Sequence, residues 1–542
     1  MNIDKFAKIM GGADNCNLRR DIAGRDSGGG AMKRMFAAAL AAVCAAVSAQ
    51  AATKTWSPSN GGDMAAGANW SGSTKPTSSD SITINKAQSA PVTLSEDLTA
   101  EGGNSFFTAN MELALANATG EAKTLSLSTF HLGGGSRSVR LTAGTIAFSN
   151  LYLGDNGSTY VNDVFSVEGA GTALQGGTVY VGTKAPNDTL VVSGGASLTG
   201  TTLNIGRNQM NDSSPSTNNC FRATGSGTTV AFSTSVNFGS SGLCRLEVLD
   251  GATFATTNLS VCHNTSYTNI PWYGGNSVRV SGTGSKIVVN GANNGGIMLG
   301  DTPAPDCTIV VENGALWESR GEFKLGWNNY VTNAMVRVAS GATLKHDNTN
   351  LQIGALATGT NLVLEVDGGT VSVGENSSSA CGVYVKGFDC AARISNGGLL
   401  KTTGDIGIGN GVGTNAMLSV SGAASKVQAG ATLRIYPGSS LNVEIPSGGF
   451  ANGAAPVTCK MLTLNAAGSL AVSLGDGWGK EAAGTYRIVI AEAENDISVP
   501  DGFTISVPED SEHVKVERDT TNAKQLAFNV RVTKSGLAII VR

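Results

Sequence analysis

One short pattern recurs along most of this 542-residue chain and limits what it can fold into. Its positions are an apolar residue, any residue, a second apolar residue and glycine, as in Leu151-Tyr152-Leu153-Gly154. A recurrence every 20 to 50 residues or so is typical of solenoids, so the pattern predicts a stack of about a dozen similar coils. The pattern ends at the following glycines: Gly133, Gly154, Gly182, Gly206, Gly239, Gly300, Gly326, Gly354, Gly387 and Gly409.

The segment Ser277–Gly300 contains one complete unit. Its three apolar runs are Val278 with Val280, Ile287–Val289 and Ile297–Leu299, and Gly, Ser, Thr and Asn separate them. Each run has the length of a strand, and the residues between the runs favour turns. We therefore expect the flanking apolar residues of each four-residue pattern to point inward, the middle residue to point outward, and the glycine to turn the chain with positive φ.

The repeats resemble those shared by autotransporter passengers and exosortase-sorted bacterial surface proteins. The segments VRVSGTGSKIVVNG, LVVSGGASLTGTTLNIG, FSVEGAGTALQGGTVYVG and LSVSGAASKVQAGATLRIY carry the resemblance, which spans residues 125–445. It implies an all-β fold, a right-handed parallel β-helix of the pectin-lyase-like type, in an exported protein. The tail departs from both families, because it has neither the length of a membrane barrel nor an apolar span after Val507-Pro508-Glu509-Asp510.

Composition agrees with a turn-rich solenoid and excludes one class of partner. The chain has 72 glycines, and only 14% of its residues are charged. The formal net charge of −4 provides no basic field for a phosphate backbone, so we expect no nucleic-acid partner.

The start of the chain predicts export. Residues 32–51 combine Lys33-Arg34, an apolar run from Met35 to Val47, and small residues at a cleavage site after Ala51, which is typical of a secretory signal peptide. Residues 1–31 are then an extension, with translation expected to start at Met32. We expect an extracellular, cell-surface or periplasmic protein with no transmembrane anchor in the mature chain.

Both ends of the repeat region predict caps. Residues 52–124 contain Trp56 and Trp70, which we expect to cover the apolar end of the first coil, with carbohydrate stacking as the alternative. Residues 446–542 lose the repeat and show longer alternating runs, which predict a small antiparallel β cap or sandwich.

Seven cysteines lie in the mature part, so they cannot all pair internally. Cys244, Cys307 and Cys390 each precede a turn glycine by the same interval, which predicts equivalent places in separate coils, beyond disulfide reach. Cys381 and Cys390 are the one candidate pair. The chain has no C-x-x-C spacing and only isolated histidines, so we expect neither a metal site nor a cofactor.

Two groups of aromatic residues are candidate ligand-binding sites. His131, Tyr152 and Tyr180 occupy the outward middle position of the pattern in successive units, which predicts an aromatic stripe along which a glycan can lie. Such residues also pack on each other simply as neighbours on adjacent strands. Trp272 and Tyr273 lie in a long insertion, His263–Asn276, which either binds a ligand or shields a seam of the stack.

One cluster of charges raises the alternative of an enzyme. Glu318, Arg320, Glu322 and Lys324 alternate with apolar residues, and β-helix polysaccharide lyases and hydrolases use grouped carboxylates with a basic residue. Alternating opposite charges also describe a solvated strand face, which we favour. We therefore expect no catalytic residues but an exported structural or adhesive protein whose partner is a polysaccharide or cell-surface matrix; the alternative is a polysaccharide lyase or glycoside hydrolase.

Overall fold

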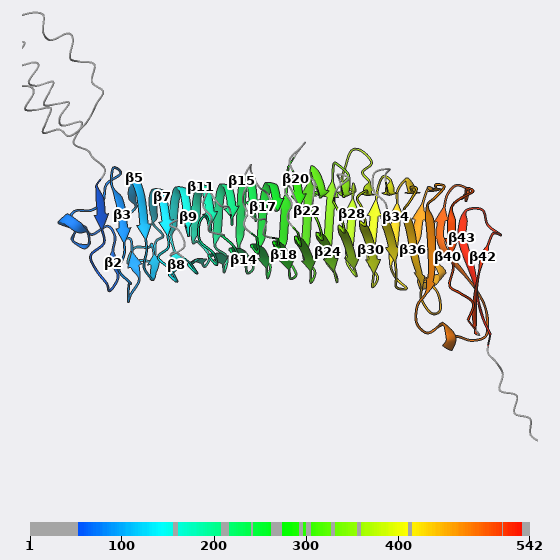
Figure 1. Ribbon diagram of the computed structural model, residues 1–542. Helices are drawn as coiled ribbons and strands as arrows, with labels where there is room; N and C mark the ends of the chain where they lie inside the picture. Colours follow the sequence, from blue (N-terminus) through cyan, green and yellow to red (C-terminus); the bar gives the residue numbers. More distant parts are fainter. Residues whose placement is uncertain are drawn as a thin grey trace, which may run out of the picture. The chain divides into compact units, whose positions relative to one another are not determined.

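The computed structural model describes residues 52–154, 161–206, 216–239, 242–261, 274–291, 305–326, 331–354, 359–409, 415–511 and 513–533, and the backbone of 296–299. Residues 52–542 form one compact unit. This unit is a right-handed parallel β-solenoid (Figure 1), as the repeats predicted. The predicted extension 1–31 and leader 32–51 lie outside the described residues.

One face of the solenoid is a parallel sheet to which each coil contributes one short strand; we call it the first sheet. Its residues alternate between buried and exposed, which places one side in the core. In order along the stack, its strands are β2 (Gly62–Asp63), β4 (Val92–Thr93), β6 (Met111–Ala114), β8 (Ser138–Ala143), β10 (Val164–Glu168), β12 (Thr189–Ser193), β14 (Cys220–Thr224), β16 (Arg245–Leu249), β18 (Ser277–Ser281), β21 (Thr308–Glu312), β24 (Met335–Ala339), β27 (Val363–Asp367), β30 (Ala391–Ser395), β33 (Met417–Val420), β36 (Ser440–Ile445), β39 (Ser469–Leu474) and β41 (Thr504–Ser506).

The second sheet closes the rest of each coil. In the N-terminal half, each coil crosses it as one strand, which is long from β5 onward: β1 (Thr53–Thr55), β3 (Ser81–Ile84), β5 (Leu98–Phe107), β7 (Thr124–Leu132), β9 (Thr145–Leu153), β11 (Ala173–Val181), β13 (Ser197–Ile205), β15 (Thr229–Phe238) and β17 (Thr253–Val261). After β17, each long strand divides into two. In some of these coils a left-handed residue, such as Gly321 (φ 85°) or Asn348 (φ 74°), lies at the division.

The divided strands form two branches of the second sheet. The leading branch contains β19 (Lys286–Val289), β22 (Leu316–Arg320), β25 (Thr343–Asp347), β28 (Thr370–Val373), β31 (Leu399–Thr402), β34 (Lys426–Ala429) and β37 (Val457–Cys459). The trailing branch contains β20 (Gly296–Leu299), β23 (Glu322–Leu325), β26 (Leu351–Ile353), β29 (Val383–Val385), β32 (Ile406–Ile408), β35 (Thr432–Ile435) and β38 (Met461–Leu464).

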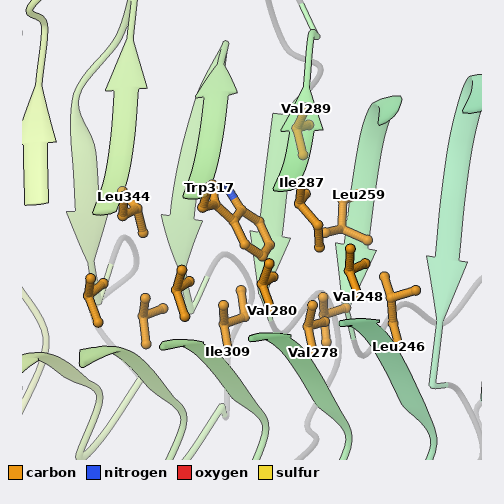
Figure 2. Packing of buried hydrophobic residues seen from close by; sticks show 14 of the residues in the cluster. Leu246, Val248, Leu259, Val278, Val280, Ile287, Val289, Ile309, Trp317 and Leu344 are labelled. Carbon is orange, nitrogen blue, oxygen red and sulfur yellow. The ribbon is translucent and has the colours of Figure 1, made fainter. Parts of the chain in front are cut away.

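The inward side chains of both sheets form one continuous core along the stack. Val278 of β18 lies in register between Leu246 and Ile309 of the neighbouring coils, and all three are fully buried. Figure 2 shows these residues facing Ile287 and Trp317 of the second sheet across the interior. Since fully burying one such side chain contributes about 1.5–3 kcal/mol, each coil is stabilised mainly by its neighbours.

The glycine of the recurring pattern meets one particular residue of the next coil. We call the residue just before each first-sheet strand the corner residue. Gly182 has φ 68°, and a β-carbon there would lie 2.0 Å from Nδ2 of the corner residue Asn219. Glycine is therefore required here for two reasons. Its backbone is left-handed, and the corner residue of the next coil fills the space that a side chain would need.

Parallel pairing extends beyond the predicted limits of 125–445. It begins with β1 on β3 and continues past Ile445, where β39 pairs with both β36 and β41. The predicted C-terminal antiparallel element is present as β40 (Gly484–Ala493), β43 (Gln525–Val532) and β42 (Val514–Asp519). Because β40 also pairs in parallel with β37, this element is continuous with the stack. Short 3-10 helices lie near the ends: η2 (Gly67–Asn69), η3 (Ser71–Ser73), η5 (Ala451–Gly453) and η6 (Trp478–Lys480).

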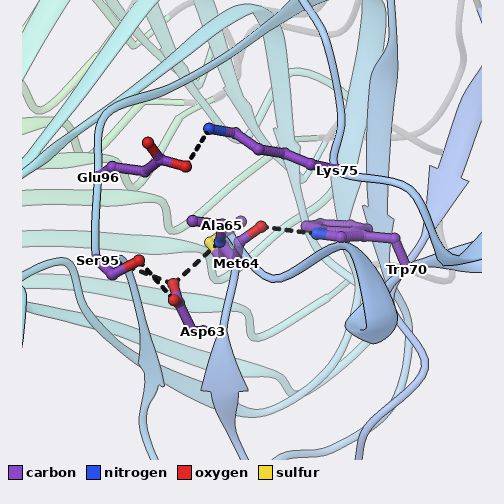
Figure 3. Close-up of polar contacts among 7 residues, drawn as sticks. All are labelled: Asp63, Met64, Ala65, Trp70, Lys75, Ser95 and Glu96. Carbon is purple, nitrogen blue, oxygen red and sulfur yellow. Dashed lines mark hydrogen bonds and ion pairs between the residues drawn. The ribbon is translucent and has the colours of Figure 1, made fainter.

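The two N-terminal tryptophans cover the first coil. Trp56 and Trp70 are 0% and 2% exposed, and their rings meet edge to face with centroids 5.0 Å apart. Trp70 Nε1 donates to the carbonyl of Met64 at 2.7 Å, beside the Asp63–Ser95 hydrogen bonds (Figure 3). Since neither ring face is accessible, these residues do not provide the alternative of carbohydrate stacking.

The cysteines lie where the spacing placed them, but the candidate pair does not form. Cys244, Cys307 and Cys390 are all corner residues, and Cys244 and Cys390 are free thiols. Cys381 and Cys390 are unbonded because Cys381 precedes a strand of the second sheet, whereas Cys390 is at the corner of the first sheet. Cys307 is disulfide-bonded, which the spacing did not predict.

One corner residue is a buried carboxyl group. Asp188 is fully buried, and burial raises its pKa to about 8. Its Oδ1 accepts from the backbone of Asp163 at 2.9 Å, but its Oδ2, which faces Gly154, has no partner among the described residues. At the equivalent corner, the Asn276 amide uses both ends, accepting from Cys244 and donating to Gly239 O at 2.9 Å.

Asp188→Asn is therefore expected to stabilise the protein at pH 8 but not at pH 4. The folded-state pKa of about 8 lies above the unfolded value near 3.9, so stability is full below about pH 4 and is lost as pH rises to 8, by about 1.4 kcal/mol per pH unit. Melting temperatures across this range test it, with Asn219→Asp, which adds a second buried carboxyl group, as the opposite control. An equal effect of Asp188→Asn at both pH values contradicts the assignment.

Leu243 occupies a position where other coils place asparagine. It has φ 53° and is 56% exposed, whereas Asn218 and Asn187 hold the same left-handed conformation one and two coils before it. Leu243→Asn is expected to raise stability by about 1 kcal/mol, because asparagine adopts this conformation at lower cost. Chemical unfolding checks the value. If Leu243→Ala stabilises equally, removal of exposed apolar surface is the cause instead.

Candidate functional site

The predicted aromatic stripe exists and is longer than predicted. Phe106, His131, Tyr152 and Tyr180 lie on successive strands of the second sheet, at one outward position of the register. We call these four residues the aromatic ladder. Neighbouring ring centroids are 4.7, 5.0 and 4.5 Å apart, with interplanar angles of 18°, 10° and 3°.

The ladder presents ring edges rather than ring faces. Because the rings stack nearly parallel at the coil spacing, each inner ring has a neighbouring ring on both faces. The column continues past Tyr180 as Asn204 and Asn237, whose amides are hydrogen-bonded at 3.2 Å. A sugar ring therefore cannot stack along the middle of the ladder, and mutual packing explains the rings themselves.

A row of polar side chains runs beside the ladder. Two residues before each ladder position, and before Asn204 that follows them in the column, the strands carry an amide or a hydroxyl group on the same outward face. These side chains are half-buried or exposed and repeat once per coil. We call them the polar row: Asn104, Thr129, Asn150, Thr178 and Thr202.

The second pair of candidate residues, Trp272 and Tyr273, lies outside the described residues. Their role as ligand-binding residues stays a prediction.

The charged cluster is divided between two strands. Gly321, with φ 85°, separates Glu318 on β22 from Glu322 on β23, so the expected single alternating strand is wrong. Glu318 pairs with Lys286 at 2.8 Å, and Glu322 pairs with Lys324 at 2.6 Å. Lys324 is buried rather than exposed, while Arg320 is exposed. Glu318 is thus held by a lysine of the preceding coil, and Glu322 by a lysine of its own strand.

A serine and a histidine meet nearby, but inside the core. Ser319 Oγ lies 3.0 Å from Nδ1 of His346, and both residues are at most 3% exposed. Burial lowers the pKa of His346 to about 4, and its ring packs edge to face against Phe323. Since no substrate reaches a buried pair, the contact satisfies an interior polar group.

The outer face of the first sheet carries opposite charges in register. Arg222 pairs with Glu247 at 2.6 Å across adjacent strands, and Arg279 pairs with Glu312 at 2.6 Å. Further along, Arg337 contacts both Glu365 and Asp367. Hydrogen bonding to Arg337 and then to Asn396 lowers the pKa of Asp367. These pairs make this face a chain of neutralised charges.

Two open hollows lie over the C-terminal coils, with volumes of about 450 and 500 Å³. Neither includes the aromatic ladder. The first is lined by residues that include Asn361, Asp389, Arg393, Asn415 and Met417, and the second by residues that include Thr458, Cys459, Lys460, Glu492 and Glu494.

Comparisons with known proteins give no relative from which a function can be transferred. No family model matches the chain, and no curated protein matches its sequence significantly. In the described part of the chain, no three His, Cys, Asp or Glu side chains are grouped so as to hold a metal ion. The same residues contain no helix with the length and apolarity that crossing a membrane requires.

Two aromatic features of the second sheet were not predicted from the sequence. Phe106 lies in the region assigned to the cap, so the ladder was expected to start one coil later. Tyr384 shortly precedes the pattern glycine Gly387, and Tyr436 ends the repeat LSVSGAASKVQAGATLRIY, yet their association across Gly407 has no signal in the pattern. A search for aromatic residues at every middle position, irrespective of spacing, finds Tyr384.

Loss of one ladder ring is expected to lower stability modestly. Tyr180→Ala removes the stack on Tyr152 and should cost about 1–2 kcal/mol, while Tyr180→Phe keeps the ring and should cost less than about 0.5 kcal/mol. Denaturant unfolding of both variants provides the measurement. Equal losses for the two variants show that the hydroxyl group, and not ring stacking, stabilises this position.

Proposed function

We propose that the chain is an exported structural or adhesive protein that lies against a polysaccharide or cell-surface matrix. The observation that supports it best is the polar row, which repeats one amide or hydroxyl group per coil along the axis of the stack. Coils are about 4.8 Å apart, so the row offers hydrogen-bonding groups at a regular interval. A polymer with a repeating set of hydroxyl groups has matching chemistry.

The leader-like segment 32–51 and the repeats that resemble those of autotransporter passengers and exosortase-sorted proteins support export. The disulfide at Cys307 is consistent with it, because disulfides persist mainly in oxidising compartments. The paired charges of the first sheet suit a solvated surface.

Retention on immobilised polysaccharides tests the proposal. We expect the purified protein to be retained without releasing new chain ends, and Asn150→Ala with Thr178→Ala to weaken retention about three- to tenfold. Ser166→Ala, on the outer face of the first sheet, is the matched control and should retain wild-type binding.

Two results contradict the proposal. New chain ends that disappear in Glu318→Gln or Glu322→Gln make the protein a carbohydrate-active enzyme. Absence of retention on every polymer in a panel of plant, host and bacterial polysaccharides removes the adhesive role.

A further inference from the structure

A second group of aromatic and charged residues lies on the trailing branch, far along the stack from the aromatic ladder. Tyr384 and Lys386 belong to one coil, Gly407 to the next, and Arg434 with Tyr436 to the one after that. All four of the larger side chains are partly exposed. We call them the tyrosine platform.

The missing side chain of Gly407 determines how the two tyrosines lie. A β-carbon at Gly407 would be 2.8 Å from Cδ1 of Tyr384 and 3.6 Å from Cε2 of Tyr436, so both rings lean over this residue. The opposite edge of Tyr384 approaches Gly382, where a β-carbon would be 3.0 Å from Cε2. Tyr384 therefore lies along the sheet, whereas the rings of the aromatic ladder stack on each other.

A cation lies beside each tyrosine. Lys386 Nζ is 5.2 Å from the ring centre of Tyr384, and Arg434 Cζ is 5.6 Å from that of Tyr436, to whose hydroxyl group it donates at 3.1 Å. Two coil steps separate Lys386 from Arg434, about 9.6 Å along the axis. That distance is close to the length of two sugar units in an extended glycan.

The local charge balance favours an anion. Lys386 has no ion pair among the described residues, and Asp405 is the carboxylate whose charge acts on both Tyr384 and Arg434. Asp405 also accepts the backbone N–H of Thr432 at 2.9 Å. Burial, and then the charge of Lys324, lowers the pKa of Lys386. The charged form of Lys386 is thus destabilised in the free protein, and a bound anion would stabilise it.

We propose that the tyrosine platform binds an anionic polysaccharide, with Lys386 and Arg434 contacting acidic groups and the two tyrosines contacting the sugar rings between them. Aromatic rings suit the apolar faces of sugars, and a guanidinium group suits a carboxylate. This assignment rests on the proposed polysaccharide-binding function and specifies the class of polymer.

Electrophoresis of the purified protein through native gels that contain polygalacturonate, dextran sulfate or neutral dextran tests the site. We expect retardation by one or both anionic polymers, and about tenfold weaker binding for Lys386→Gln combined with Arg434→Gln, as for two exposed charge contacts. Dextran sulfate distinguishes a sulfate from a carboxylate as the preferred acid. Arg393→Gln is the matched control, since it removes an exposed cation from the first sheet.

Melting temperatures confirm that the double variant is folded. Unchanged retardation of this variant overturns the site, as does an equal loss in Arg393→Gln, which indicates nonspecific attraction. Retention by neutral dextran alone overturns the anionic assignment and leaves the proposed function intact. Failure to bind any of these three polymers overturns the site, whereas the proposed function is overturned only by failure on the whole panel of polysaccharides described above.

Discussion

The contact between a pattern glycine and the corner residue of the next coil determines how this chain stacks. At Gly182, the backbone is left-handed and the Asn219 side chain occupies the space beside its Cα. The same arrangement pairs Gly154 with Asp188 and Gly239 with Asn276. The pattern glycine therefore has two roles: it turns its own coil, and it leaves space for the corner residue of the next coil. Because this contact fixes how one coil lies on the next, it helps to set the register of the strands. The corner has little spare space, since Oδ2 of Asp188 lies against Gly154 and has no hydrogen-bond partner among the described residues.

The repeat predicted the parts of the fold that depend on local pattern. The inward Leu151 and Leu153, the outward Tyr152 and the turn at Gly154 all lie as expected, because alternation and turn chemistry are local properties. The predicted limits of the stack, residues 125–445, were too narrow, because coils near the ends, such as those of β3 and β39, pair in parallel without carrying the full pattern. Where the second sheet divides after β17, single left-handed residues such as Gly321 and Asn348 lie at the break, and the apolar spacing does not report them.

Residue spacing predicted some features of the candidate sites and not others. The spacing placed His131, Tyr152 and Tyr180 together, but it could not show that their faces are used by each other. Conversely, Tyr384 and Tyr436 are brought together by the small size of Gly407, a property of three successive coils rather than of any one repeat. The relation of Glu318 to Glu322 was misjudged for a similar reason, since one left-handed glycine places them on different strands.

Both ends of the solenoid differ from its middle, and this bears on whether two molecules can associate end to end. A bare coil would offer its strand edges to a second molecule, as in a growing fibril. Here Trp56 and Trp70 close one end, and the antiparallel strand β42 stands at the other with Lys515, Glu517 and Arg518 exposed. Charges on an edge strand discourage further pairing, so the exposed charged side chains of β42 oppose the addition of a second molecule at this edge.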